Sequence, residues 1–438
     1  MSTTAKPLVT SMPEKRTNTT AIFIIGFLFF IFGFITWLNG SLIQFLKLVC
    51  QLQNDVQAFL VTSAFYMAYF FLAIPSSIIL KKTGFKKGMA LGLLVMAIGS
   101  VIFIPAARER SFGLFLTGLF IQGMGLALLQ TASNPYISII GPIESAAQRI
   151  SIMGICNKTA GIISPLILSA VLLSNATGLE KQIDATTDAA QKEQLLNELA
   201  ARVINPYIVI AIMLAILAFM LLKSPLPEIE AENGNDAATK NAKADKTSIW
   251  QFPHLLLGAL CIFVYVGVEV MAGDAIGVYG KTMGMPLDQT KYFTTFTLIA
   301  MLVGYVTGVF TIPKIISQKK ALQISAVLGI AFSIGVYITQ GYSAITFIAL
   351  LGLANALMWP AIWPLAIDGL GKFTKTGSAL LVMGIAGGAV VPIIYATLKN
   401  KDGINMANHQ AFFVCMLPCY LYILYYAIKG HKAGRNKV

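Results

Sequence analysis

Long apolar segments without charged residues dominate this sequence. Segments 21–37, 88–106, 203–222 and 410–428 contain no Asp, Glu, Lys or Arg, and each approaches the roughly 20 residues that a membrane-spanning helix needs. Because lipid supplies no hydrogen-bond partners, spanning segments must be helices or closed barrels. Continuous apolar runs exclude the alternating pattern of a barrel strand. We therefore predict an all-α membrane protein.

Twelve segments of this kind can be placed along the chain. We expect helices at 21–45, 57–80, 88–106, 111–138, 147–174, 203–222, 255–280, 291–315, 321–340, 343–367, 376–398 and 410–428. The chain then divides into a tail (1–20), a first six-helix bundle (21–225), a linker (226–249), a second six-helix bundle (250–428) and a second tail (429–438).

Two polar segments separate helices by more than a short turn. Segment 175–202 carries five acidic residues and a helix-favouring stretch, and we expect an amphipathic helix that lies over the outer face. Segment 226–249 is rich in Ala, Asn, Asp, Glu and Lys, which is typical of a flexible linker.

Composition and charge agree with a membrane protein. Only 12% of the residues are charged and 56% are hydrophobic, whereas a soluble domain has about a quarter charged residues. Of the 32 Lys and Arg residues, 21 fall in the tails and in the loops that share their side, and 10 fall in the loops of the other side. This asymmetry predicts that both termini are cytoplasmic. It also accounts for the net charge of +13 without a nucleic-acid partner.

The two halves of the chain share local features. Each has a basic turn between its second and third helices, at 81–87 and 318–320, and each has proline in its fourth helix, at Pro135 and Pro360. Two six-helix halves around a central linker resemble the major facilitator superfamily. In carriers of this kind the substrate binds near mid-membrane between the halves, and rocking of the halves alternates access.

Four stretches narrow the resemblance to one branch of that superfamily. They are residues 34–40 in the first helix, 128–136 in the fourth, 265–269 in the seventh and 387–392 in the eleventh. Together they are similar to the fucose–proton symporters, and within that branch to the glucose/galactose transporters and N-acetylglucosamine permeases. The resemblance implies a monomeric, multi-pass sugar carrier of the bacterial inner membrane. It implies no cofactor beyond a coupling ion, Na⁺ or H⁺.

The chain departs from the fucose–proton symporters at two positions that matter for coupling. In those symporters an Asp in the first helix and a Glu in the fourth carry proton coupling and sugar recognition. Here Gly40 and Gln130 stand at the matching positions, and neither side chain can ionise. Glutamine at the fourth-helix position also occurs among sodium-coupled glucose/galactose members, which favours Na⁺ over H⁺.

Few ionisable residues fall inside the predicted helices, and these few are candidates for function. An ionisable group at mid-membrane costs about 2.5 kcal/mol or more, so it usually faces a cavity and has a partner or a role. Glu269 lies one turn after Tyr265 and shares its face. We expect Glu269 to bind sugar hydroxyls or the coupling cation. The alternative is that it pairs with the deeply placed Lys158 only to neutralise a buried charge.

Asp274 lies in a glycine-rich part of the same helix. Gly273 and Gly277 flank it, and such glycines predict a broken outer half-helix, which carriers use for gating and ion contact. Glu269, Asp274 and Lys158 are therefore the ion-coupling candidates. The alternative for Asp274 is a carboxylate at the outer membrane edge, in contact with water.

Amides and aromatic residues complete the predicted sugar site. An amide both donates and accepts hydrogen bonds, as sugar hydroxyls require, although helix-to-helix hydrogen bonding is an alternative role. The amide candidates for substrate binding are Asn39, Gln130, Asn134 and Asn157. Trp37, Trp359 and Trp363 can offer apolar faces to a sugar ring, although we expect Trp363, like Tyr66 and Tyr69, to serve packing. Tyr265, on the face of Glu269, is a further candidate for substrate binding.

These observations favour a cation-coupled hexose symporter. Within transport, the alternatives are a permease for N-acetylglucosamine, fucose or another sugar, and an exporter of hydrophobic solutes. Outside transport, the alternative is a sugar sensor that binds without carrying. The sequence contains no nucleophile–base pair or metal-ligand spacing that would indicate an enzyme.

Overall fold

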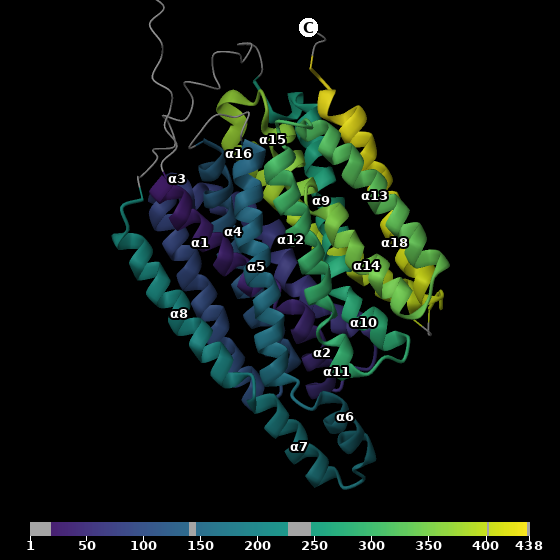
Figure 1. Cartoon of the computed structure of the whole chain (residues 1–438). Coiled ribbons are helices and arrows are strands. Elements are labelled where there is room, and N and C mark those ends of the chain that lie inside the picture. The colour runs from purple at the N-terminus through teal and green to yellow at the C-terminus, as the bar shows by residue number, and fades with distance from the viewer. Residues whose placement is uncertain (1–18, 140–145, 227–246, 401–402, 436–438) are drawn as a thin grey trace, which may run out of the picture.

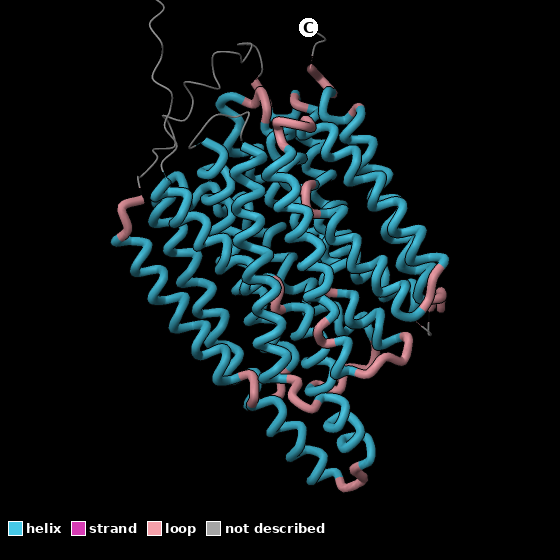
Figure 2. Tube along the Cα trace, in the orientation of Figure 1, coloured by secondary structure: helices cyan, strands magenta, loops and turns pink. Residues whose placement is uncertain are grey.

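We describe a computed structural model of the chain, at residues 19–139, 146–226, 247–400 and 403–435. In this part the chain forms long helices that run side by side through one bundle (Figure 1). Figure 2 shows the short loops that join them, and the described residues contain no strand. Most of the predicted linker and of the first tail lies outside the described residues.

The first half of the chain contains six spans. The helices are α1 (Thr19–Thr36), α2 (Asn39–Val49), α3 (Asp55–Arg108), α4 (Phe112–Ile139), α5 (Ala146–Leu172) and α8 (Ile204–Lys223). The first span is broken at Trp37 and Leu38, so that α1 and α2 are its two parts.

Helix α3 combines two spans. Its 54 residues would extend about 80 Å as one straight helix, against a hydrocarbon core of about 30 Å. Gly84 has a positive φ of 76° and interrupts the helical backbone, so the chain turns back there. The 11 apolar helical segments of the described chain therefore make twelve spans, which confirms the predicted number.

The second half repeats this plan with more interruptions. The helices are α9 (Pro253–Gly273), α10 (Ala275–Thr282), α11 (Leu287–Thr290), α12 (Phe293–Thr311), α13 (Gln318–Ile338), α14 (Gly341–Asn355), α15 (Met358–Ile367), α16 (Thr374–Met383), α17 (Gly387–Lys399) and α18 (Asn408–Ile428). Helices α9 and α10 are the two parts of the seventh span, separated at Asp274, as its glycines predicted. The first and seventh spans hold matching places in the two halves, and both are broken.

The polar segment after the fifth span forms two helices rather than one. Helices α6 (Ala176–Ala185) and α7 (Ala189–Ala201) form a hairpin that projects beyond the bundle (Figure 1), so the prediction of one helix lying on the outer face was wrong. Asp188 caps a new helix by accepting a hydrogen bond from the backbone N–H of Ala190, which starts α7. We call this end of the bundle the hairpin face. The other end, where α1 begins and α18 ends, is the terminal face.

Exposed apolar side chains cover the sides of the bundle. Phe23 on α1, Phe310 on α12 and Ile338 on α13 are each more than two-thirds exposed. A soluble surface does not carry apolar side chains in such numbers, and in a bilayer they contact lipid. The chain is therefore a multi-pass membrane protein.

Glycine allows the closest helix contacts inside each half. A β-carbon on Gly33 of α1 would lie 1.9 Å from the backbone oxygen of Asn157 on α5. A β-carbon on Gly387 of α17 would lie 1.7 Å from the backbone oxygen of Phe263 on α9. Small residues at such contacts let helix backbones approach each other in membranes.

We expect Gly33→Ala to destabilise the protein by about 2 kcal/mol or more, because the atom that it would strike belongs to a backbone that cannot rotate away. Gly113→Ala is the matched control, since a β-carbon there meets nothing within 4 Å. Thermal unfolding in detergent should show a clearly lower midpoint temperature for Gly33→Ala than for the wild type. The midpoint of Gly113→Ala should equal that of the wild type. Equal midpoints would contradict the packing argument.

Candidate substrate-binding site

A cavity lies in the middle of the bundle, between the first six spans and the last six. About 680 Å³ there is not filled by protein atoms, a volume that includes space open to solvent. Eight of the predicted site residues line it: Trp37, Gln130, Asn134, Asn157, Lys158, Tyr265, Glu269 and Trp359. The lining on α5 runs from Ile150 to Lys158, in the part of that helix nearer the terminal face. The cavity therefore lies closer to the terminal face than to the hairpin face.

The central feature of the cavity is an ion pair between its two sides. Lys158 Nζ on α5 lies 3.0 Å from Glu269 Oε1 on α9, and the side chains are only 6% and 13% exposed. The same ammonium lies 4.1 Å from the ring centroid of Trp37, in a cation–π contact. The pairing considered from the sequence is thus present, and Glu269 also remains part of the cavity wall.

Amides and hydroxyls surround this pair. Asn157 accepts a hydrogen bond at Oδ1 from Trp37 Nε1, at 3.2 Å, which holds the indole beside Lys158. On α4, Gln130 Nε2 donates to the hydroxyl of Tyr69 at 3.1 Å. Tyr265 lies one turn before Glu269 on α9 and lines the same cavity. This arrangement offers donors, acceptors and a carboxylate around one cavity.

Aromatic rings form the apolar part of the wall. The rings of Tyr265 and Trp359 are 6.3 Å apart between centroids. Trp359 in turn stacks on Trp363 at 5.3 Å, and Trp363 is fully buried outside the cavity, which confirms its predicted packing role. Trp359 is thereby held with one face available to the cavity.

Three tyrosines line the cavity although we did not predict them there. Tyr66 and Tyr69, expected to serve packing alone, are part of the wall. Their three-residue spacing, which puts both on one face of α3, is the signal that could have identified them. Tyr305 on α12 also lines the cavity, with its ring against Gly154. It lies in an apolar run that carries no comparable signal.

Two predicted site residues lie away from the cavity. Asn39 and Asp274 are each 1% exposed and do not line it. Asn39 is the first residue of α2, and Asp274 separates α9 from α10. Asn39 is two residues after Trp37, and residues at this spacing do not share a helix face. Burial also excludes the alternative of Asp274 as a water-exposed carboxylate at the membrane edge.

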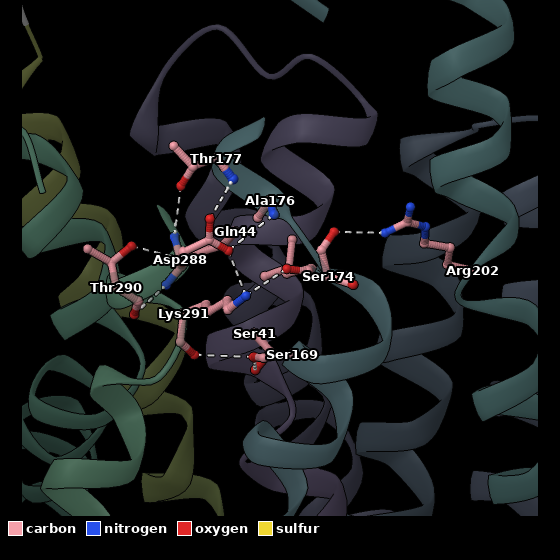
Figure 3. A network of polar contacts seen from close by, with 11 residues as sticks. Ser41, Gln44, Ser169, Ser174, Ala176, Thr177, Arg202, Asp288, Thr290 and Lys291 are labelled. Atoms are coloured by element: carbon pink, nitrogen blue, oxygen red, sulfur yellow. Dashed lines mark hydrogen bonds and ion pairs between the residues drawn. The ribbon is translucent and has the colours of Figure 1, made fainter. Parts of the chain in front are cut away.

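The hairpin face is closed by polar contacts between the two halves (Figure 3). Both oxygens of Asp288, on α11, accept hydrogen bonds from the first backbone N–H groups of α6, those of Ala176 at 3.2 Å and Thr177 at 3.1 Å. Lys291 Nζ bonds Asp288 Oδ1 and the backbone oxygen of Leu173 at the end of α5, both at 2.8 Å. An anion at a helix N-terminus and a cation at a helix C-terminus are each favourable. We call this set the Asp288 clasp.

Further contacts surround the clasp. Gln44 on α2 donates to the backbone oxygen of Thr290 at 3.1 Å, and Ser169 on α5 donates to that of Lys291 at 3.2 Å. At a separate point, Asp55 on α3 pairs with Lys399 of α17 at 2.6 Å and with Lys47 at 2.5 Å. The two halves are thus joined at several places on this face.

The described residues contain no group of three or more His, Cys, Asp or Glu arranged to hold a metal ion. The ionisable groups of the cavity are a lysine, a glutamate and tyrosines. This set can bind and orient a polar, uncharged solute through hydrogen bonds, and can respond to a cation through its carboxylate.

Comparison with known proteins agrees with this architecture. The sequence pattern of the Major Facilitator Superfamily matches residues 22–396. The chain is 34% identical over 439 aligned residues to a glucose/galactose transporter of Brucella abortus, covering 98% of each protein. It is 28% identical to the L-fucose-proton symporter of Escherichia coli, covering 89% of this chain and 90% of the relative.

A solved structure shows the same arrangement. The crystal structure of the Escherichia coli fucose–proton symporter matches with a TM-score of 0.73 at 27% identity, covering 94% of this chain and 98% of that one. The match runs through both halves and includes the helices that form the cavity. The chain belongs to the major facilitator superfamily, as a relative of its glucose/galactose transporters and fucose–proton symporters.

Proposed function

We propose that this protein is a cation-coupled symporter that imports a hexose, such as glucose or galactose, by alternating access. The observation that carries the proposal is the cavity between the halves, where an ion pair, three amides and stacked aromatic rings converge. Sugar-binding sites need this mixture, because a sugar ring combines hydroxyl groups with apolar C–H faces. The transport of sugars by the relatives supports the same conclusion.

We further propose that the hairpin face is the outside. The excess of Lys and Arg at the terminal face, with Lys81, Lys86 and Lys320 among them, supports this orientation through the positive-inside rule. The Asp288 clasp then faces the outside, and the cavity lies nearer the cytoplasm. In this arrangement the protein is closed to the outside, in the part of the cycle in which sugar is released inward.

In the proposed binding mode, Glu269 accepts hydrogen bonds from sugar hydroxyls. Gln130 on α4 and Asn157 on α5 donate and accept from the first half of the chain, and Trp359 of the second half provides a flat apolar surface. Because Lys158 neutralises Glu269 across the halves, sugar hydroxyls that bond the carboxylate alter the contact that joins the halves. Substrate binding and domain movement can thereby be coupled.

The expected sodium coupling gains no support from the relatives. Those whose names give a coupling ion are fucose–proton symporters. The names of the glucose/galactose transporters give none. A coupling cation remains part of the proposal, and the carboxylates of the bundle are the groups that can respond to it.

The proposed function is tested by uptake into proteoliposomes across a panel of sugars, with H⁺ and Na⁺ gradients imposed separately. We expect one or more hexoses to accumulate under one of these gradients, with competition by unlabelled hexose and none by lipophilic cations. Competition by lipophilic cations would instead indicate an exporter of hydrophobic solutes. Sugar binding without counterflow would indicate a sensor and contradict transport.

A further inference from the structure

A buried carboxylate lies where the two broken spans cross. Asp274 separates α9 from α10, and Gly40 lies in the first turn of α2, just after the break in the first span. A β-carbon on Gly40 would lie 3.4 Å from Asp274 Oδ1 and 2.5 Å from the hydroxyl of Thr294. Asp274 therefore places its carboxylate against position 40, across the boundary between the halves.

Trp37 separates this carboxylate from the cavity. The indole lines the cavity and packs on Gly273, whose β-carbon, if present, would lie 2.3 Å from Trp37 Cζ3. Asp274 comes directly after Gly273, and it is 1% exposed. It therefore lies behind Trp37 and is closed off from solvent in this state.

The carboxylate is buried without a counter-ion in contact. Within the described part of the chain, no side chain donates a hydrogen bond to either oxygen, and no salt bridge includes Asp274. Its polar neighbour is the backbone N–H of Gly40, at a geometry outside that of a regular hydrogen bond. Burying an ionised carboxylate in this way costs far more than burying a neutral carboxylic acid.

Two charged side chains act on Asp274 electrostatically, those of Glu269 on α9 and Lys158 on α5. The neutral hydroxyl of Tyr66 on α3 also faces it. The elements α2 and α12 present uncharged groups, those of Gly40 and Thr294. One lysine thus serves two carboxylates. Lys158 already contacts Glu269 at 3.0 Å, so the set is neutral only when one proton is bound.

We propose that Asp274 carries the proton that couples sugar uptake to an ion gradient. This rests on the proposed symport function and names the ion and its carrier. When the hairpin face is open, an ionised Asp274 takes a proton from water on the outside and becomes a neutral carboxylic acid. Closure of the two broken spans around the neutral acid then carries the proton inward with the sugar.

Release completes the cycle without further chemistry. After the sugar has left Glu269, Trp37 moves aside and opens Asp274 to the cavity; the O–H bond of Asp274 then breaks and the proton passes to water there. Lys158 then compensates one of the two carboxylate charges, that of Glu269, and the charge left on Asp274 favours the open arrangement. Because protonation favours the closed arrangement and an ionised Asp274 favours the open one, the external proton concentration biases the transition.

The test uses full-length protein in proteoliposomes, with the hexose that the wild type carries best. We expect Asp274→Asn, which is neutral at every pH, to keep sugar counterflow without an ion gradient within about threefold of wild type. It should lose accumulation under an inward proton gradient, so that internal and external sugar concentrations become equal. Asp184→Asn, at an exposed position on α6, is the matched control and should accumulate sugar normally.

A second measurement does not depend on transport. In unbuffered detergent solution, sugar binding should draw about one proton from the medium in the wild type and none in Asp274→Asn, as a pH indicator reports. Asp274→Glu should recover proton-driven accumulation with an altered pH dependence. Proton-driven accumulation by Asp274→Asn, or accumulation that only a Na⁺ gradient drives, would overturn the inference. Absence of any sugar counterflow in the wild type would instead contradict the proposed function.

Discussion

Replacing Glu269 by Gln is expected to abolish accumulation of sugar and to lower the rate of uptake by at least about 100-fold. The substitution leaves the Lys158 ammonium 6% exposed and without its carboxylate partner, and breaking a buried ion pair from one side costs about 3–5 kcal/mol. It also removes the acceptor that we assign to sugar hydroxyls. Initial rates and final accumulation in proteoliposomes measure both effects.

A double variant separates the two roles of the pair. If Glu269 serves only to neutralise Lys158, the combination of Lys158→Gln with Glu269→Gln should recover sugar counterflow, because neither member of the pair is left unpaired. If Glu269 binds sugar, the double variant should fold with near wild-type stability and stay inactive. Wild-type accumulation by Glu269→Gln alone would remove Glu269 from the binding site altogether.

Replacing Lys291 by Met is expected to open the hairpin face. The ammonium holds the C-terminal carbonyl of α5, that of Leu173, and the carboxylate of Asp288 together. Loss of hydrogen bonds to a charged group costs about 1.5–3 kcal/mol, which corresponds to a roughly 10-fold to 100-fold shift in the population of the open form. Accumulation of sugar should fall, because a carrier that rests open to the outside releases bound sugar back to the outside.

The opening can be measured by the chemical reactivity of a buried position. Ser41 lies on α2 behind the clasp and is 1% exposed. With the five native cysteines replaced, Ser41→Cys should react with a membrane-impermeant maleimide at least about 10-fold faster when Lys291→Met is present. The control is Arg202→Met, because Arg202 donates to the neighbouring carbonyl of Ser174 at 3.2 Å within the first half of the chain. It should leave the reactivity unchanged, and equal rates in all three proteins would argue against the clasp.

Two sites hold the halves together in the proposed transport cycle. The Lys158–Glu269 pair joins α5 and α9 at the cavity, and the Asp288 clasp joins α11 to the ends of α5 and α6. Helix α5 therefore takes part in both. In the proposed cycle, a movement that follows sugar binding at Glu269 reaches the clasp through Lys158 and the 27-residue helix α5, which contains Pro165 between these two points.

The sequence by itself determined the membrane class and the number of spans. Apolar length is enough for this, since lipid allows no backbone hydrogen bond to remain unsatisfied. The break in the seventh span also followed from local sequence, because Gly273 and Gly277 flank Asp274. The shared face of Tyr265 and Glu269 followed from helical periodicity, and both residues line the cavity.

Contacts between helices required the tertiary structure. Only the structure showed which side of the first span faces the cavity: Trp37 lines it and Asn39 does not. The sequence left open whether Glu269 meets Lys158, and the packing of α5 against the second half brings them together. Periodicity describes one helix at a time, so it could not place the carboxylate of Asp274 against Gly40 or that of Asp288 on the end of α6. Those contacts depend on how the two halves meet, because they form across a boundary that no local pattern encodes.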